Sequence, residues 1–140
     1  MRPEPLPTVG VVGPSIDPVN VSVRALRGAT TVEVDSIEQV QSRTIALLTE
    51  MVERNGVDHD DIISILFTAT DDIHSTFPAT AARHAGFGDV PLICARELEI
   101  VNATDRCIRI MMHVSTTVAR SELRHVYLEG AAGLRDDLPG

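Results

Sequence analysis

CIRIMMHV, residues 107–114, is the stretch that decides the fold. Its side chains alternate, and alternation with a period of two indicates a β-strand with one buried face. One side of this strand is apolar throughout: Ile108, Ile110, Met112 and Val114. The other side carries Cys107, Arg109, Met111 and His113. We therefore predict a central strand whose apolar side faces the core and whose other side holds a guanidinium between two sulfur side chains.

Arg109 in such a half-apolar setting cannot release its proton and needs an anion or a hydrogen-bond acceptor. Alternation over residues 96–100 puts two glutamates on one face, and Glu97 is one of them. Glu97 could pair inside the protein with Arg27 or Arg109 as a buried salt bridge. Alternatively, several guanidiniums face one hollow and hold a small molecule with more than one carboxylate. Residue type does not decide between these hypotheses, because all twelve basic residues are Arg.

The composition is typical of a globular domain with a hydrophobic core, since 140 residues are 44% hydrophobic and 23% charged. A net charge of −8 and 3% aromatic residues argue against nucleic acid or an anionic membrane as a partner. No apolar run approaches the ~20 residues of a membrane span, and the N-terminus lacks a signal-peptide pattern. We therefore expect a cytoplasmic protein with Cys94 and Cys107 as reduced thiols, although nothing in the sequence excludes a disulfide.

Proline content divides the chain into two parts. Residues 1–20 hold five of the eight prolines, which predicts a flexible leader followed by one domain over residues 21–140. Gly28 is expected to end the first strand of that domain. Pro91 indicates that the strand over residues 90–94 either lies at a sheet edge or begins near this proline. Besides 107–114, the predicted strands cover residues 21–27, 62–69, 90–94 and 123–128.

Two helices are predicted between these strands. The first carries an apolar stripe at helical spacing: Ile37, Val40, Thr44, Leu47, Leu48, Met51 and Val52. Asp35 and Glu38 are expected to form its capping box, and Asn55–Gly56 to end it. The second helix is expected to have Pro78 at its first position. Because helices and strands mix without regular βαβ alternation, we predict an α+β fold, a mixed β-sheet with helices on one face.

Groups for acid–base or nucleophilic catalysis are scarce. The five histidines (residues 59, 74, 84, 113 and 125) have no Ser or Cys neighbour at a telling spacing. No glycine-rich phosphate loop occurs, and the cysteines offer no zinc spacing. The acidic cluster at 58–61 is typical of a solvated helix start rather than a metal site. A reaction on this chain is therefore expected to depend on charge placement rather than on proton transfer.

Five motifs together resemble the AroH-class chorismate mutases, the small trimeric mixed α/β enzymes. They are RALRGATTV at 24–32, FPA at 77–79, Cys94 with Glu97, CIRIMM at 107–112 and RHVYLE at 124–129. The resemblance covers about residues 23–138 and leaves the leader outside. It implies a homotrimer that forms a pseudo-barrel, with a site at each subunit interface. It also implies an isomerase that converts chorismate to prephenate by a Claisen rearrangement in Phe and Tyr biosynthesis, without metal, cofactor or covalent intermediate.

The resemblance also implies residue roles. Arg109 would contact the ether oxygen and a carboxylate of the substrate, and Glu97 would hold the ring hydroxyl and face the positive ring. Arg27 and Tyr127 would bind the side-chain carboxylate, and Cys94 and Ile93 would lie at the hydroxyl end. The adjacent subunit would contribute Phe77, Ala79, Thr80 and Arg83. The C-terminal flap would contribute Leu134 and Arg135.

Two positions depart from the family pattern. Thr80 stands where relatives carry Lys, and Ile93 stands where they carry Thr. The first change is expected to weaken attraction for the ring carboxylate, and the second leaves only main-chain hydrogen bonding, so activity is expected to survive with a higher KM.

Two rival functions fit part of this pattern. A trimeric imine deaminase of the RidA type has a similar fold and an interfacial arginine, but it lacks the motifs at 24–32 and 124–129. A non-catalytic binder of prephenate or an aromatic amino acid would keep the arginines, yet loss of charge at 109 or 97 would then be expected, and both charges are present.

Overall fold

The computed structural model of the chain describes residues 21–135, so the predicted leader lies outside the described residues. The strands are β2 (Ser22–Thr31), β3 (Ile62–Ala69), β4 (Leu92–Arg96), β5 (Cys107–Thr116) and β6 (Val126–Tyr127). The helices are α1 (Ile37–Asn55) and α2 (Pro78–Ala82), with η3 (Arg83–Phe87) continuing α2 as a wider turn. Three short 3-10 segments complete the elements, η2 (His59–Asp61), η4 (Arg120–Glu122) and η5 (Glu129–Arg135).

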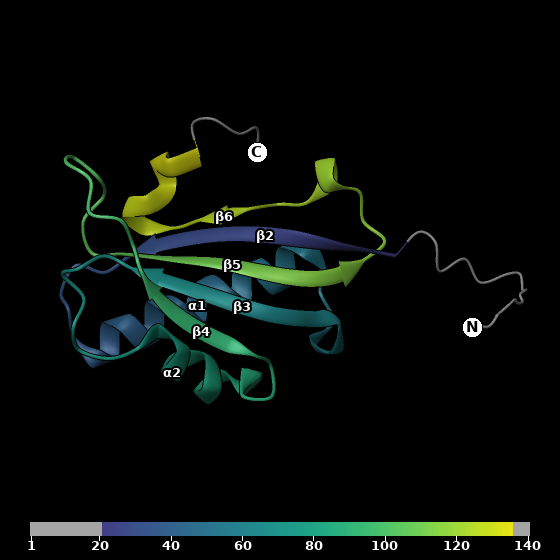
Figure 1. The fold of residues 1–140 in the computed structure, drawn as a ribbon, viewed down its shortest axis with the longest axis horizontal. Helices are drawn as coiled ribbons and strands as arrows, with labels where there is room; N and C mark the ends of the chain where they lie inside the picture. The colour runs from purple at the N-terminus through teal and green to yellow at the C-terminus, as the bar shows by residue number, and fades with distance from the viewer. Residues whose placement is uncertain (1–20, 136–140) are drawn as a thin grey trace, which may run out of the picture.

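The strands form one mixed sheet in the order β4-β3-β5-β2-β6 (Figure 1). β5 pairs antiparallel with both of its neighbours, whereas β4 is parallel to β3 and β6 is parallel to β2. The predicted central position of residues 107–114 is therefore confirmed. β4 is an edge strand that begins directly after Pro91, which agrees with the inference from that proline.

The two faces of the sheet differ in what covers them. The predicted apolar side of β5 is buried, because Ile108, Ile110, Met112 and Val114 are all at most 3% exposed. Residues of α1 and α2 share the main core cluster with this side, and α1 passes behind the sheet in Figure 1. The predicted α+β fold with both helices on one face is confirmed. The opposite face, which carries Arg109 and Met111 and is not covered by α1 or α2, is called the helix-free face.

Helix α1 follows the sequence prediction with one correction at its start. Its stripe is buried at Val40, Thr44, Leu47, Leu48 and Met51, and its C-cap Gly56 has the left-handed φ of 58°. The N-cap is Ser36, whose hydroxyl accepts from the backbone N–H of Gln39, so the predicted capping box of Asp35 and Glu38 was wrong.

Asp35 instead accepts backbone N–H groups from His74 and Ser75, at 2.8 and 3.1 Å. Although desolvation opposes the change, these hydrogen bonds lower the pKa of Asp35. The carboxylate thus fixes the loop that leads into Phe77 and α2, a contact that no local sequence pattern reveals.

Two predicted strand boundaries were also wrong. β2 runs through Gly28, which pairs with Ile110 and Val126. Glycine suits this position because an added Cβ would lie 2.5 Å from the Met51 sulfur. β6 is only two residues long. Residues 97–100, whose side chains alternate in the sequence, lie outside any strand, and Leu98 and Ile100 are exposed.

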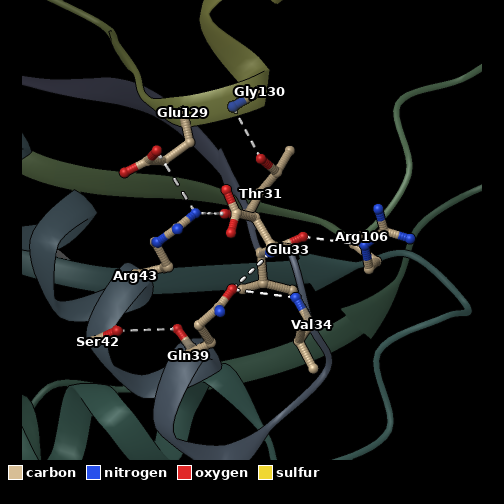
Figure 2. Close-up of polar contacts among 10 residues, drawn as sticks. Thr31, Glu33, Val34, Gln39, Ser42, Arg43, Arg106, Glu129 and Gly130 are labelled. Atoms are coloured by element: carbon tan, nitrogen blue, oxygen red, sulfur yellow. Dashed lines mark hydrogen bonds and ion pairs between the residues drawn. The ribbon is translucent and has the colours of Figure 1, made fainter.

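The C-terminal segment η5 lies on the helix-free face, and polar contacts fix its start (Figure 2). The backbone N–H of Gly130 donates to Thr31 Oγ1 at 2.9 Å. Arg43 of α1 donates to the Thr31 carbonyl at 2.6 Å and lies 3.7 Å from Glu129. A second, smaller apolar cluster forms beneath η5 from Ala29, Cys107, Tyr127, Ala131 and Leu134.

Within residues 21–135, no helix combines the length and apolar character that crossing a membrane requires.

Candidate active site

A hollow of about 250 Å³ opens on the helix-free face, and its charged lining residues come from β2, β5 and the segment that follows β4. Four predicted site residues line it: Arg27, Glu97, Arg109 and Tyr127. Leu66, Met111 and Thr68 supply neutral walls. The structure therefore brings these four residues together around one hollow.

Strand register explains why these residues meet. Arg109 of β5 lies between Thr68 of β3 and Ala29 of β2, and Tyr127 of β6 is the next partner of Ala29. Arg27 comes two residues before Ala29 and so points to the same face. A shift of any of these strands by one residue would turn its side chain into the core.

Arg109 and Glu97 form an ion pair, with Nε and Oε2 2.7 Å apart. The Nε–H is not aligned with that oxygen, so this nitrogen makes no regular hydrogen bond. Both side chains remain partly exposed, at 42% and 27%. The expected pair of Glu97 with Arg109 is therefore present, but it is not buried as that hypothesis required, and the guanidinium remains accessible to a ligand.

Arg27 has no carboxylate within salt-bridge distance among residues 21–135. The hollow therefore holds two guanidiniums against the single carboxylate of Glu97. This excess of positive charge, on a chain whose net charge is −8, favours an anionic ligand at this place.

Thr68 is a site residue that the sequence analysis missed. Its hydroxyl donates to Glu97 Oε2 at 3.1 Å, the same oxygen that contacts Arg109. The backbone of Glu97 is held as well, because its N–H donates to the carbonyl of Ala69 at 3.0 Å. Thr68 lies 29 residues from Glu97 in sequence, and the parallel pairing of β3 with β4, which ends one residue before Glu97, brings the two together.

We expect Thr68→Val to lower the activity proposed below about tenfold in kcat/KM, the scale of losing one hydrogen bond to a charged group. The substitution keeps the side-chain shape and leaves one Glu97 oxygen without its donor. Thr68→Ser is the matched control and should stay close to wild type, because it keeps the hydroxyl. Equal activity of the Val and Ser variants would remove Thr68 from this role.

The residues that the resemblance assigns to an adjacent subunit lie away from the hollow of Arg109 in the same chain. Phe77 is 69% exposed and lines a separate hollow of about 580 Å³ together with Cys94. Ala79 is buried in the helix-covered core, and Thr80 and Arg83 follow it in α2 and η3. Within one chain, these side chains do not line the hollow that contains Arg109.

Cys94 and Ile93 occupy opposite faces of β4. Ile93 lies on the helix-free face and is 63% exposed, whereas Cys94 packs against the main core. Burial raises the pKa of the Cys94 thiol, although the Ala79 backbone and the charge of Arg83 oppose the shift. Burial likewise raises the pKa of Cys107. Both thiols are free, as predicted, and a raised pKa makes each a weak nucleophile.

The C-terminal flap is only partly described. Leu134 packs beside Tyr127 in the cluster beneath η5, so it approaches the edge of the hollow. Arg135 ends η5, and its side chain lies outside the described residues.

The described residues contain no group of three His, Cys, Asp or Glu side chains placed to hold a metal ion. The acidic residues before β3 are exposed and begin the short 3-10 segment η2, in agreement with the predicted solvated helix start, and His59 lies 2.8 Å from Asp89. Chemically, the hollow offers two positive forks, one carboxylate and one phenol. Such a set can bind a dianion and stabilise charge that develops within it.

Comparison with known proteins agrees with this geometry. The chorismate mutase type I family pattern matches residues 23–138. Over 117 residues the chain is 42% identical to chorismate mutase AroH of Bacillus subtilis, covering 83% of this chain and 92% of that one. The AroH enzyme of Thermus thermophilus is also 42% identical over 117 residues, with 83% and 96% covered.

A solved structure of chorismate mutase from Clostridium thermocellum superposes with a TM-score of 0.76 at 45% identity, covering 77% of this chain and 96% of that one. Family pattern, relatives and architecture all agree with the motifs identified in the sequence. This chain belongs to the chorismate mutase type I family.

Proposed function

We propose that this chain is an isomerase that converts chorismate to prephenate. One observation carries the proposal: Arg27, without a carboxylate partner in the described residues, shares a hollow with the Arg109–Glu97 pair. Chorismate carries two carboxylates, so a site with surplus positive charge suits it. Membership of the chorismate mutase type I family supports the same activity.

The proposed mechanism is electrostatic. The ether C–O bond breaks ahead of C–C bond formation, so negative charge grows on the ether oxygen and positive charge on the ring. We assign Arg109 to the ether oxygen and one carboxylate, because its partly exposed fork has donors beyond the Nε that faces Glu97. Glu97 would hold the ring hydroxyl and stabilise the positive ring, and its 2.7 Å contact keeps it beside Arg109.

The remaining roles are assigned in the same way. Arg27 and Tyr127 would bind the side-chain carboxylate, since both line the hollow and come from β2 and β6, which follow β5 on one side of the sheet. Ile93 and Cys94 would lie at the hydroxyl end, and Leu134 and Arg135 would close the site. The rearrangement is unimolecular and redistributes its own electrons, so we propose that it needs no metal, cofactor or enzyme-bound intermediate.

We further propose a homotrimer with sites shared between subunits. The helix-free face supports this, because Val23 and Ile93 are 62% and 63% exposed there, and Leu66 and Met111 are only partly buried. An adjacent copy on this face would bring Phe77, Ala79, Thr80 and Arg83 toward the hollow. The Thr at position 80 would cost some attraction for the ring carboxylate.

A turnover assay with native mass measurement tests both proposals. Purified protein mixed with chorismate should form prephenate far faster than the spontaneous reaction, and the particle should weigh about three times 15.1 kDa. Prephenate binding without turnover would identify the non-catalytic binder, and imine hydrolysis without chorismate turnover would identify a RidA-type deaminase. An active monomer would contradict the shared site.

The wider setting is proposed on the same basis. We place the activity in the biosynthesis of Phe and Tyr and in the cytoplasm, a location that the two free thiols support. We also propose that residues 21–140 form one domain with residues 1–20 outside it, since the family pattern begins at residue 23 and ends at 138.

A further inference from the structure

His125 contacts the backbone of Arg27, a residue that lines the hollow. The Arg27 N–H donates to the ring nitrogen Nδ1 at 3.0 Å, across 98 residues of sequence. His125 belongs to the 124–129 motif and precedes Tyr127 by two residues. The mechanism proposed above gives it no role, although one hydrogen bond joins it to a residue that lines the hollow.

This hydrogen bond extends the pairing of β6 with β2 beyond the two residues of β6. β6 pairs with β2 only at Val126–Gly28 and Tyr127–Ala29. At one end of this pairing, the Leu128 N–H donates to the carbonyl of Ala29 at 2.9 Å. At the other end the His125 ring accepts the N–H of Arg27. Because the edge strand is so short, these two end contacts hold Tyr127 in register beside Arg27.

The contact requires a neutral imidazole. An acceptor at Nδ1 places the single ring proton on Nε2, whereas an imidazolium carries a proton on both nitrogens and cannot accept. Burial lowers the pKa of His125, and the positive charge of Arg27 lowers it further. From the α1 side, the neutral Asn55 holds the backbone of Arg124 rather than facing the ring with a charge.

We propose that His125 is a positioning residue, whose neutral ring holds Arg27 and Tyr127 at the spacing that the substrate carboxylate needs. Protonation converts the acceptor into a donor and loosens β6 from β2. The inference rests on the proposed chorismate mutase activity. Since that reaction transfers no proton to the enzyme, an acid-side loss of activity reports on binding groups rather than on an acid–base catalyst.

The direction with pH follows from the lowered pKa. As pH falls below about 6.5, the ordinary histidine value, the unfolded chain takes up a proton before folded His125 does. The hydrogen bond is therefore present at neutral pH, and it is lost as pH falls through the lowered pKa of the folded state. KM should rise over this acidic range, with a smaller change in kcat.

Two substitutions separate the acceptor from the titrating group. His125→Asn keeps an acceptor near the place of Nδ1 but does not titrate. Its KM should match wild type at neutral pH, and it should rise less than the wild-type KM as the pH falls. His125→Ala removes the acceptor and should raise KM about three- to tenfold at every pH, the scale of one neutral hydrogen bond. His59→Asn, at an exposed histidine of η2, should leave the profile unchanged.

Nitrogen NMR gives a readout that does not depend on turnover. In wild type, His125 Nδ1 should show the shift of an unprotonated ring nitrogen at neutral pH, and the Arg27 amide should titrate together with this ring. An Arg27 amide that ignores the titration, or a His125→Asn variant that keeps the full acid-side rise in KM, would overturn the proposal. Failure to convert chorismate would overturn the proposed function, while the NMR result would still decide the contact.

Discussion

Replacing Arg109 with Ala is expected to lower kcat/KM for chorismate by at least ~10²–10³-fold, the scale of removing one preorganised donor to a developing oxyanion. The guanidinium stands on the central strand, so neighbours on both sides fix its position in the hollow. Alanine also leaves Glu97 without its ion-pair partner. Most of the loss should appear in kcat, because the proposed contact with the ether oxygen would strengthen only as the C–O bond breaks.

Arg109→Lys tests the geometry of the fork separately from its charge. A single ammonium cannot serve the ether oxygen and a carboxylate together, so this variant should be nearly as impaired as the alanine variant. Arg120→Ala, at an exposed arginine of η4, is the control and should behave as wild type. Thermal melting should show that the variants at position 109 are folded. A loss below tenfold in the alanine variant would remove Arg109 from the proposed role.

Regular alternation is the reason that much of this site could be predicted from sequence. Because side chains on a strand alternate, the apolar set at 108, 110, 112 and 114 is enough to place Arg109 on the opposite face. The partner of Arg109 stayed open, since alternation says nothing about which carboxylate crosses the sheet. The structure answers this question: Glu97 pairs with Arg109 and not with Arg27.

Contacts between distant segments could not be predicted. Thr68 reaches Glu97 across 29 residues, and His125 reaches Arg27 across 98. In the sequence, Thr68 is one of two polar residues in an otherwise apolar strand, and His125 is one of five histidines. Only the register of β3 against β5 and of β6 against β2 identifies them as neighbours of the site.

Local patterns failed where tertiary packing competed with them. Asp35 is well spaced for a capping box, but two backbone N–H groups of a distant loop bind its carboxylate and Ser36 caps the helix instead. Gly28 resembles a strand end, yet it is a place in the strand where the Met51 side chain approaches the backbone closely. In each case the residue type was informative, but its partner lay elsewhere in the chain.

Mixing two impaired variants should restore activity if each site is built by two subunits. Arg109→Ala removes a guanidinium from the hollow. Arg83→Ala should lower kcat/KM about tenfold or more, as expected for one charged contact with a carboxylate. In the proposed trimer, Arg109 and Arg83 of one site come from different chains. Random assembly of equal amounts then gives both wild-type residues to about a quarter of the sites, so activity should reach about a quarter of wild type.

The matched control pairs two variants whose altered residues line the same hollow within one chain. Arg109 and Glu97 lie 2.7 Å apart in a single subunit, so mixing Arg109→Ala with Glu97→Gln leaves every site defective and should restore nothing. Co-refolding, native mass measurement and a chorismate assay on the mixed trimers would check both cases. Activity no higher than the mean of the separate variants in the Arg109→Ala and Arg83→Ala mixture would show that a site does not combine these residues from two chains.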